Sequence, residues 1–210
     1  MKNRPRFRSI YWALPVTVII LAGCAGTSPP VQFYTLSSVT ALQHEPHAGP
    51  VGQDIAIGVG PVNIPKFLDR PQIVIRTSAN KIEVSEFHRW GGSLHADFLR
   101  VLTDNLSIIL GTDRVAPYPW GDRFSPTYRI VLDLETFEGR LGEYVQLDVT
   151  WTVSRREAKE TLLVKKATIR ESAAMEDYEG LVVAKSRALA TLSREIAKEI
   201  RGLERTQRGL

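Results

Sequence analysis

Apolar and polar residues alternate most clearly in the second half of the chain. Every second residue from Val145 to Val153 is apolar, and segment 128–137 shows the same alternation. A third segment, 161–171, follows after a polar turn. Because successive side chains of a strand point to opposite faces, this pattern predicts three strands with one packed face and one polar face. Such strands are typical of an antiparallel sheet that is covered on one side.

Two other segments repeat their apolar residues every three or four positions, which predicts amphipathic helices. The first runs from Ser93 to Leu110, with Ser93 in the N-cap region and Gly111 just past the end. The second runs from about Tyr178 to Leu203. We expect an α+β fold, a mainly antiparallel sheet with both helices packed on one face, because this arrangement buries both apolar stripes.

Shorter elements are predicted in the first half of the chain. They are strands at 32–36 and 55–62, a hairpin formed by 72–76 and 81–87, and a short strand at 114–116. A polar loop is expected at 37–54, and proline-rich turns are expected at 64–71 and 117–121. Gly58 and Gly60 lie inside the second strand and predict a bulge or a close approach of another group to the backbone.

The first residues of the chain have the pattern of an export signal. Four basic residues between Lys2 and Arg8 precede an apolar run from Ile10 to Gly23, which is 14 residues long. A helix needs about 20 apolar residues to cross the hydrocarbon core of a bilayer, so this run is too short for a permanent span. Two interpretations of this segment are an ordinary signal peptide with an incidental cysteine and a single inner-membrane anchor.

Cys24 favours a more specific interpretation. The sequence Leu21-Ala22-Gly23-Cys24 resembles the bacterial lipobox, in which the cysteine thiol receives a diacylglycerol. Cleavage then leaves the cysteine as the new N-terminus, whose amino group receives an acyl chain such as palmitate. We therefore predict a lipoprotein signal peptide at 1–23, a lipidated tether at 24–31, a domain at 32–204 and a tail at 205–210. Ala25 is typical of lipoproteins sent to the periplasmic leaflet of the outer membrane. Cys24 is the only cysteine, so no disulfide forms within one chain.

The basic balance of the sequence comes from the signal peptide. The chain has 27 Lys and Arg against 23 Asp and Glu, and four of the basic residues but no acidic residue precede Cys24. The remainder is therefore 23 against 23, which argues against a nucleic-acid partner. The basic residues of the last helix are expected to form a solvated face, with lipid headgroups or an acidic partner as the alternative: Lys185, Arg187, Arg194, Lys198, Arg201, Arg205 and Arg208.

No catalytic or cofactor motif is recognisable in the sequence. His44 and His47 have a superficial metal spacing, but Pro46 breaks any helix that would align them, and no third ligand lies nearby. His88 is expected at a polar corner, and His95 at a helix start. There is no phosphate-binding loop and no nucleophile elbow. We predict a protein that is not an enzyme and has no metal and no cofactor besides the lipid on Cys24.

Several segments, taken in order, resemble one family. They are 33–36, 65–74, 86–90, 110–115, 117–120 and 192–197. Together they are similar to the ABC-type transport auxiliary lipoproteins, the PqiC/YmbA-like family, and they cover nearly the whole mature chain. The resemblance implies a non-catalytic accessory of an ABC transporter that works with an MCE-domain protein in moving phospholipid between membranes. The lipoprotein would dock the end of the periplasm-spanning MCE-domain protein at the outer membrane.

Aromatic and proline residues at turns are the candidates for that docking edge: Phe67, Leu68, Pro71, Trp90, Tyr118 and Trp120. Their alternative role is structural, as turn and core residues. Because MCE partners form rings, a ring-like homo-oligomer is a further expectation. Two other functions remain open at this stage, a plug or chaperone of an outer-membrane protein and a periplasmic hydrolase.

Overall fold

The computed structural model describes residues 29–42, 51, 55–121, 124–155, 160–207 and 209. Residues 31–210 form one compact unit. The predicted signal peptide, Cys24, His44 and His47 lie outside the described residues. The predicted boundaries at 23, 31 and 204 therefore stay predictions.

A five-stranded sheet forms the main layer of the domain. Its strands are ordered β5 (Val115–Pro117), β2 (Ile57–Asn63), β6 (Tyr128–Arg140), β7 (Tyr144–Arg155) and β8 (Glu160–Ser172). The strands β6, β7 and β8 are antiparallel to one another, whereas β2 runs parallel to both of its neighbours. Along β7, buried and half-buried residues alternate, as the sequence pattern predicted.

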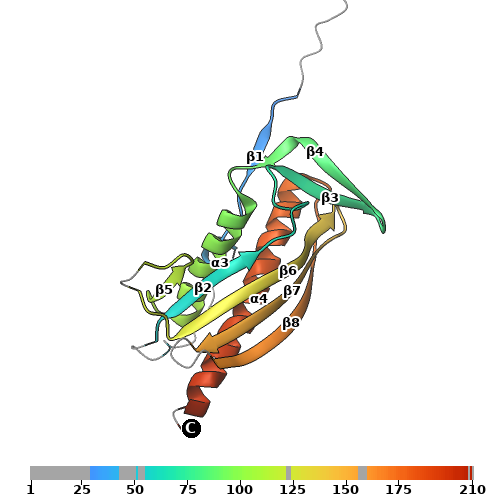
Figure 1. Cartoon of the computed structure of the whole chain (residues 1–210). Coiled ribbons are helices and arrows are strands. Elements are labelled where there is room, and N and C mark those ends of the chain that lie inside the picture. The colour runs from blue at the N-terminus through green and yellow to red at the C-terminus, as the bar shows by residue number, and fades with distance from the viewer. Residues whose placement is uncertain are drawn as a thin grey trace, which may run out of the picture. The chain divides into compact units, whose positions relative to one another are not determined.

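A smaller three-stranded sheet lies beside the five-stranded one. Its order is β1 (Gln32–Tyr34), β4 (Lys81–Trp90) and β3 (Gln72–Ser78). The strands β3 and β4 form the predicted hairpin, and β1 pairs with the end of β4 in parallel. In Figure 1, this sheet lies near the beginning of the last helix.

Two long helices cover one face of the five-stranded sheet (Figure 1). They are α3 (Leu94–Leu110) and α4 (Tyr178–Gln207). The Ser93 side chain caps the first turn of α3 by accepting a hydrogen bond from the Ala96 amide, and Gly111 ends the helix with a φ of +65°. These two ends confirm the predicted caps. A one-turn helix, α2 (Val39–Leu42), lies in the segment predicted to be a loop.

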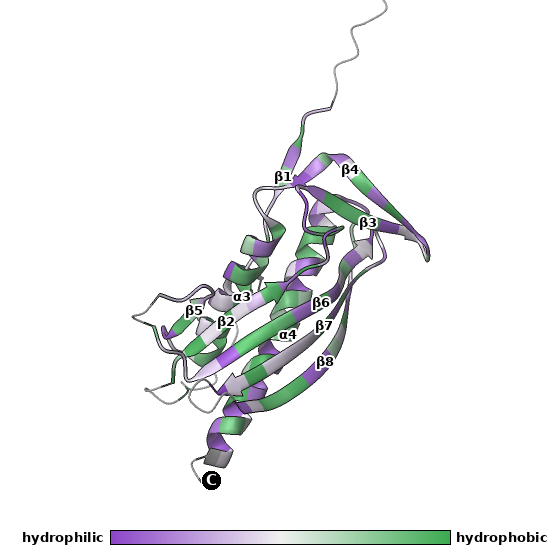
Figure 2. Ribbon diagram, viewed as in Figure 1, coloured by the Kyte–Doolittle hydropathy of each residue, from purple (hydrophilic) through white to green (hydrophobic). Residues whose placement is uncertain are grey.

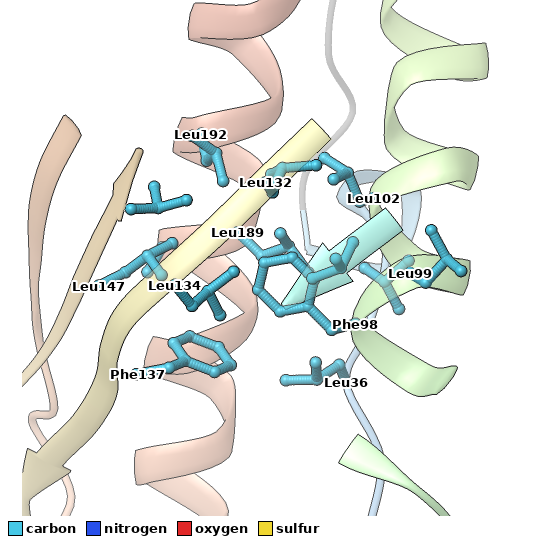
Figure 3. Close-up of a cluster of buried hydrophobic side chains, with 14 of the residues drawn as sticks. Leu36, Phe98, Leu99, Leu102, Leu132, Leu134, Phe137, Leu147, Leu189 and Leu192 are labelled. Carbon is cyan, nitrogen blue, oxygen red and sulfur yellow. The ribbon is translucent and has the colours of Figure 1, made fainter. Parts of the chain in front are cut away.

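The core lies between the helices and the sheet. Phe98 of α3 meets Phe137 of β6 edge to face, with ring centroids 5.5 Å apart. Figure 3 shows leucines of both helices and of β6 and β7 around these rings, among them Leu102, Leu132, Leu147, Leu189 and Leu192. In Figure 2, apolar residues follow the inner sides of α3 and α4.

The α+β class is confirmed, but the sheets are mixed rather than purely antiparallel. The chain leaves β2, forms the β3–β4 hairpin and α3, and returns through β5 to reach β6. That long crossover brings β6 beside β2 in the same direction. An alternation within one segment shows that the segment is a strand, but it does not show in which direction the neighbouring strand runs.

A buried polar side chain joins α2, α3 and α4. Asn105 of α3 is fully buried and accepts a hydrogen bond of 2.8 Å from the Val39 amide at the start of α2. Its side-chain amide also donates to the Ser193 hydroxyl of α4, at 3.2 Å. Because a buried polar group is costly without partners, this satisfied group fixes one relative position of α2, α3 and α4.

Candidate docking surfaces

The six residues predicted to form a docking edge fall into two groups. The first comprises Phe67, Leu68 and Pro71, on the connector between β2 and β3, with Trp90 at the end of β4. The side chain of Phe67 is 38% exposed, and Pro71 is exposed as well. Leu68 and Trp90 are buried in the core. These two residues therefore support the connector from below and present no surface to a partner.

A shallow hollow of about 480 Å³ lies at this first group, lined by residues 69–71 and 90–93. The Trp90 amide donates a hydrogen bond of 2.7 Å to the Pro71 carbonyl, which ties the connector to the end of β4. The Nε atom of Arg70 is buried there and has no hydrogen-bond partner among the described residues. A partner that reached this hollow would meet a carboxylate, a guanidinium group and a proline, from Asp69, Arg70 and Pro71.

The second group is a corner formed by Tyr118 and Trp120 after β5. Tyr118 is 45% exposed and meets Trp120 edge to face, with ring centroids 5.4 Å apart. The indole of Trp120 donates a hydrogen bond of 2.9 Å to the Ala116 carbonyl. The guanidinium carbon of Arg129 lies 5.6 Å from the centroid of the Trp120 ring. These contacts hold Trp120 in place beneath the exposed Tyr118.

Gly58 explains why the Trp120 ring can lie so close to β2. A β-carbon built at Gly58 would lie only 2.6 Å from Cε2 of Trp120 and 3.0 Å from Cγ of Pro126. Two residues further, Gly60 has a φ of +112°, and the pairing of β2 with β6 shifts register between Val59 and Val62. The predicted close approach and the predicted bulge are both confirmed.

Substituting Gly58 with valine is expected to displace the indole of Trp120 and to lower the free energy of unfolding by about 1–3 kcal/mol, since the added carbons overlap the ring. Urea unfolding measures the loss, and tryptophan fluorescence reports the displaced ring. The Gly121→Ala variant is the matched control, because a β-carbon at Gly121 meets nothing within 4 Å. An unchanged stability of Gly58→Val would contradict the packing of Trp120 on β2.

The two groups are not joined by direct polar or ring contacts among the described residues. Among the described residues, no hydrogen bond or ring contact joins the connector at 64–71 to the corner at 117–121. Phe67, Pro71 and Tyr118 are exposed, and Trp120 is half-buried. Binding of a partner at either group stays a prediction. Apart from Trp90, which ends strand β4, these residues lie outside the strands and helices as the sequence predicted, but the sequence did not show which of their side chains point inward.

His88 and His95, the histidines within the described residues, have structural partners. The His88 ring stacks on Tyr178 of α4 at a centroid distance of 3.8 Å and shares a hydrogen bond of 2.8 Å with the Tyr34 hydroxyl. His95 Nε2 lies 2.9 Å from the Val62 carbonyl oxygen. Both residues thus connect a helix to a strand. The described part of the chain contains no group of three His, Cys, Asp or Glu that could hold a metal ion.

Lys185 is the group that the sequence analysis placed wrongly. It is 1% exposed, and its ammonium donates a hydrogen bond to the Phe137 carbonyl of β6. The same Nζ lies 4.3 Å from the centroid of the Phe137 ring. Burial lowers the pKa of Lys185 to about 7, against a smaller opposing effect of the Glu138 carboxylate.

The spacing of the helix carried a signal for this burial. Lys185 lies four residues after Leu181 and four before Leu189, so it belongs to the apolar stripe of α4. Glu138 is buried beside it on β6, with Oε1 2.5 Å from Nη2 of Arg76 on β3. Its other oxygen, Oε2, has no partner among the described residues. Lys185 thus joins α4 to β6, and the ion pair of Glu138 with Arg76 joins β6 to the small sheet.

Comparisons with known proteins agree with this architecture. A sequence model of the family described as the ABC-type transport auxiliary lipoprotein component matches residues 34–197. A crystal structure of an uncharacterized protein covers 82% of this chain and 99% of its own, with a TM-score of 0.67 and 19% identity. A crystal structure of a Xanthomonas campestris protein covers 84% of this chain and 99% of its own, with a TM-score of 0.68 and 15% identity.

The comparison with curated proteins found no match. At these identities, the two solved structures show the fold alone. None of the helices in the described ranges is both long and apolar enough to span a membrane.

Proposed function

This chain belongs to the family of ABC-type transport auxiliary lipoproteins, and we propose that it is the outer-membrane accessory of an MCE-type transport system for phospholipid. In this role, it is anchored through lipid on Cys24 and docks the end of a periplasm-spanning MCE-domain protein. It carries out no chemical step of its own. The observation that carries the proposal is the family match, which spans residues 34–197 of the domain.

The surface of the domain supports a docking role. Phe67 and Tyr118 are aromatic side chains at turns, and each is held by a well-packed neighbour, Leu68 below the first and Trp120 beside the second. Aromatic residues on a rigid base give binding energy at a low entropic cost, which is typical of hot spots at protein interfaces. We propose that these two residues contact the MCE-domain protein. The ring-like homo-oligomer is part of the same proposal, since it would match the ring of that partner.

A crosslinking pulldown of the lipidated protein from outer membranes tests this role. We expect an MCE-domain protein to be recovered with the wild type and several-fold less of it with the double variant Phe67→Ser, Tyr118→Ser. The matched control is Val164→Ser, because Val164 is an apolar residue of β8 that is 60% exposed and lies outside both groups. Both variants change exposed side chains, so the core stays intact.

Three results would decide against the proposal or its docking residues. Recovery of an outer-membrane β-barrel protein in place of the MCE-domain protein would favour the alternative function, a plug or chaperone of that barrel. Recovery of no partner would exclude stable docking. Equal recovery with the double variant and the control would move the docking site away from Phe67 and Tyr118.

A further inference from the structure

Exposed apolar residues lie on and beside the paired strands β1 and β4 of the small sheet. Phe33 of β1 is 67% exposed and pairs in parallel register with Arg89 of β4. Residues in register on neighbouring strands point to the same face, as do residues two apart along one strand. Phe33 and Arg89 therefore point to the same face. Phe87 is exposed two residues before Arg89, within a segment where the pairing of β3 with β4 shifts register, and Val31 is exposed just before β1. We call Val31, Phe33, Phe87 and Arg89 the β1–β4 face.

The opposite face of these strands is already occupied. His88 stacks on Tyr178 of α4, the Tyr34 hydroxyl shares a hydrogen bond with His88, and Trp90 is buried in the core. The strands are thus held firmly from one side only. Val31 and Phe87 are 42% and 37% exposed, so exposed apolar side chains lie on both sides of the Phe33–Arg89 pair along the chain.

Arg89 adds a positive charge to this apolar face. Its Nε atom is buried and has no hydrogen-bond partner among the described residues. No carboxylate in the described ranges forms an ion pair with its guanidinium. An arginine that has no ion-pair partner among the described residues and lies in register with Phe33 has the chemistry that suits lipid phosphates at a membrane surface.

The covalent connection to the anchor indicates which membrane surface is within reach. Seven residues, 25–31, separate Cys24 from the first residue of β1. Fully extended, seven residues span at most about 25 Å. This inference rests on the proposed lipidation of Cys24. With that lipid in place, β1 stays within this distance of Cys24, which is held at the membrane leaflet. A lipid surface is therefore the occupant that connectivity brings to this face.

We propose that the β1–β4 face rests on the headgroup region of the membrane that holds the lipid on Cys24. Phe33, Phe87 and Val31 enter the interface between headgroups and acyl chains, and the Arg89 guanidinium binds lipid phosphate. Phenylalanine is among the apolar residues that membrane-surface segments bury at this depth, and arginine extends its charge toward the phosphates. The acyl chains hold the protein in the membrane, and the β1–β4 face sets the orientation of the domain on it.

The test measures depth in the membrane with the full-length lipidated protein in vesicles of phosphatidylethanolamine and phosphatidylglycerol. Because the Cys24 thiol is acylated, a Phe33→Cys substitution provides the only free thiol, which is labelled with bimane. Doxyl-labelled phospholipids are expected to quench this label several-fold more than the same label at Val164→Cys. Val164 is a distant control, because neighbouring Lys165 bridges Glu199 of α4, whereas Tyr178 of α4 contacts the β1–β4 strands. Tyr178 and Glu199 are about 30 Å apart along the axis of α4.

The outcomes separate a membrane from a protein as the occupant. Equal quenching at the two sites would overturn the proposal. A label at position 33 that is shielded from aqueous iodide but not quenched by doxyl lipid would also overturn it, and would assign the face to a second copy of the chain. The vesicles contain no MCE-domain protein, so the result does not depend on the proposed docking.

The role of Arg89 has its own readout in the same vesicles. Quenching at position 33 is expected to increase with the fraction of anionic phosphatidylglycerol, and Arg89→Gln is expected to remove most of that increase, since it removes the charge. An increase that is the same in Arg89→Gln and in the parent protein would overturn the assignment of Arg89 to lipid phosphate.

Discussion

Substituting Lys185 with methionine is expected to remove a pH dependence of stability that the wild-type domain shows above pH 7. Burial lowers the pKa of Lys185 to about 7 in the folded protein, whereas an unfolded lysine has a pKa of about 10.4. Between these values the unfolded chain binds the proton and the folded chain does not. The wild-type free energy of unfolding therefore rises with pH in this window, by at most about 1.4 kcal/mol per pH unit.

The variant should gain most where the wild-type lysine is charged. Below pH 7 the folded wild type keeps a desolvated ammonium beside Phe137, and methionine fills a similar length without that charge. The variant loses one hydrogen bond to the Phe137 carbonyl, which offsets part of the gain. We expect Lys185→Met to exceed the wild type in stability below pH 7. This advantage should be lost as the pH approaches the pKa of lysine in the unfolded chain.

Urea unfolding of both proteins at about pH 6 and about pH 9 measures this difference, since the interval crosses the shifted pKa. The matched control is Lys198→Met, which changes an exposed lysine of the same helix. The control should follow the wild type at both values. If the free energies of unfolding of Lys185→Met and the wild type changed in parallel with pH, Lys185 would titrate as an ordinary lysine. That result would contradict the buried position of its ammonium.

Substituting Cys24 with alanine is expected to abolish lipid attachment completely. The thiol is the acceptor in the lipobox interpretation of 21–24, and no other cysteine exists in the chain. Each buried methylene contributes about 0.8 kcal/mol to membrane binding, so losing several acyl chains removes the stable anchor. Incorporation of radioactive palmitate should fall to background, and the protein should be missing from the outer-membrane fraction.

The neighbouring position provides a matched control for that experiment. Ala25→Asp keeps the thiol and should keep the palmitate, but the protein is expected in the inner-membrane fraction, as is typical of lipoproteins with aspartate at this position. Palmitate on the Cys24→Ala protein would refute the lipidation site. An outer-membrane location of Ala25→Asp would refute only the sorting rule.

Much of the fold could be predicted from the sequence, because local patterns are sufficient for single elements. The alternation in 145–153 comes from one covered sheet face, and Ser93 with Gly111 marks both ends of α3 through hydrogen bonds within a few residues. Gly58 and Gly60 also indicated their special backbone sites. In each case, the physical cause and the residue that reveals it lie close together in the chain.

The remaining features depend on partners that are distant in the sequence. The parallel direction of β2 follows from a crossover of more than sixty residues to β6. Lys185 was assigned to the surface by its charge, although its spacing from Leu181 and Leu189 placed it on the buried stripe. Leu68 and Trp90 had the composition of an exposed turn, but their burial depends on how the connector folds over the core. Residue type alone did not decide these cases.

With the proposed lipid on Cys24, the short strand β1 would give the domain an extensible connection to the membrane. Only three residues of β1 pair with β4, and beyond them the Leu36 amide is held by Asp97 at 2.6 Å. If tension from a moving partner released β1, the free tether would grow from residues 25–31 to residues 25–35. Its maximum reach would increase from about 25 Å to about 39 Å. The domain would follow its partner away from the bilayer while its helices and large sheet stayed folded.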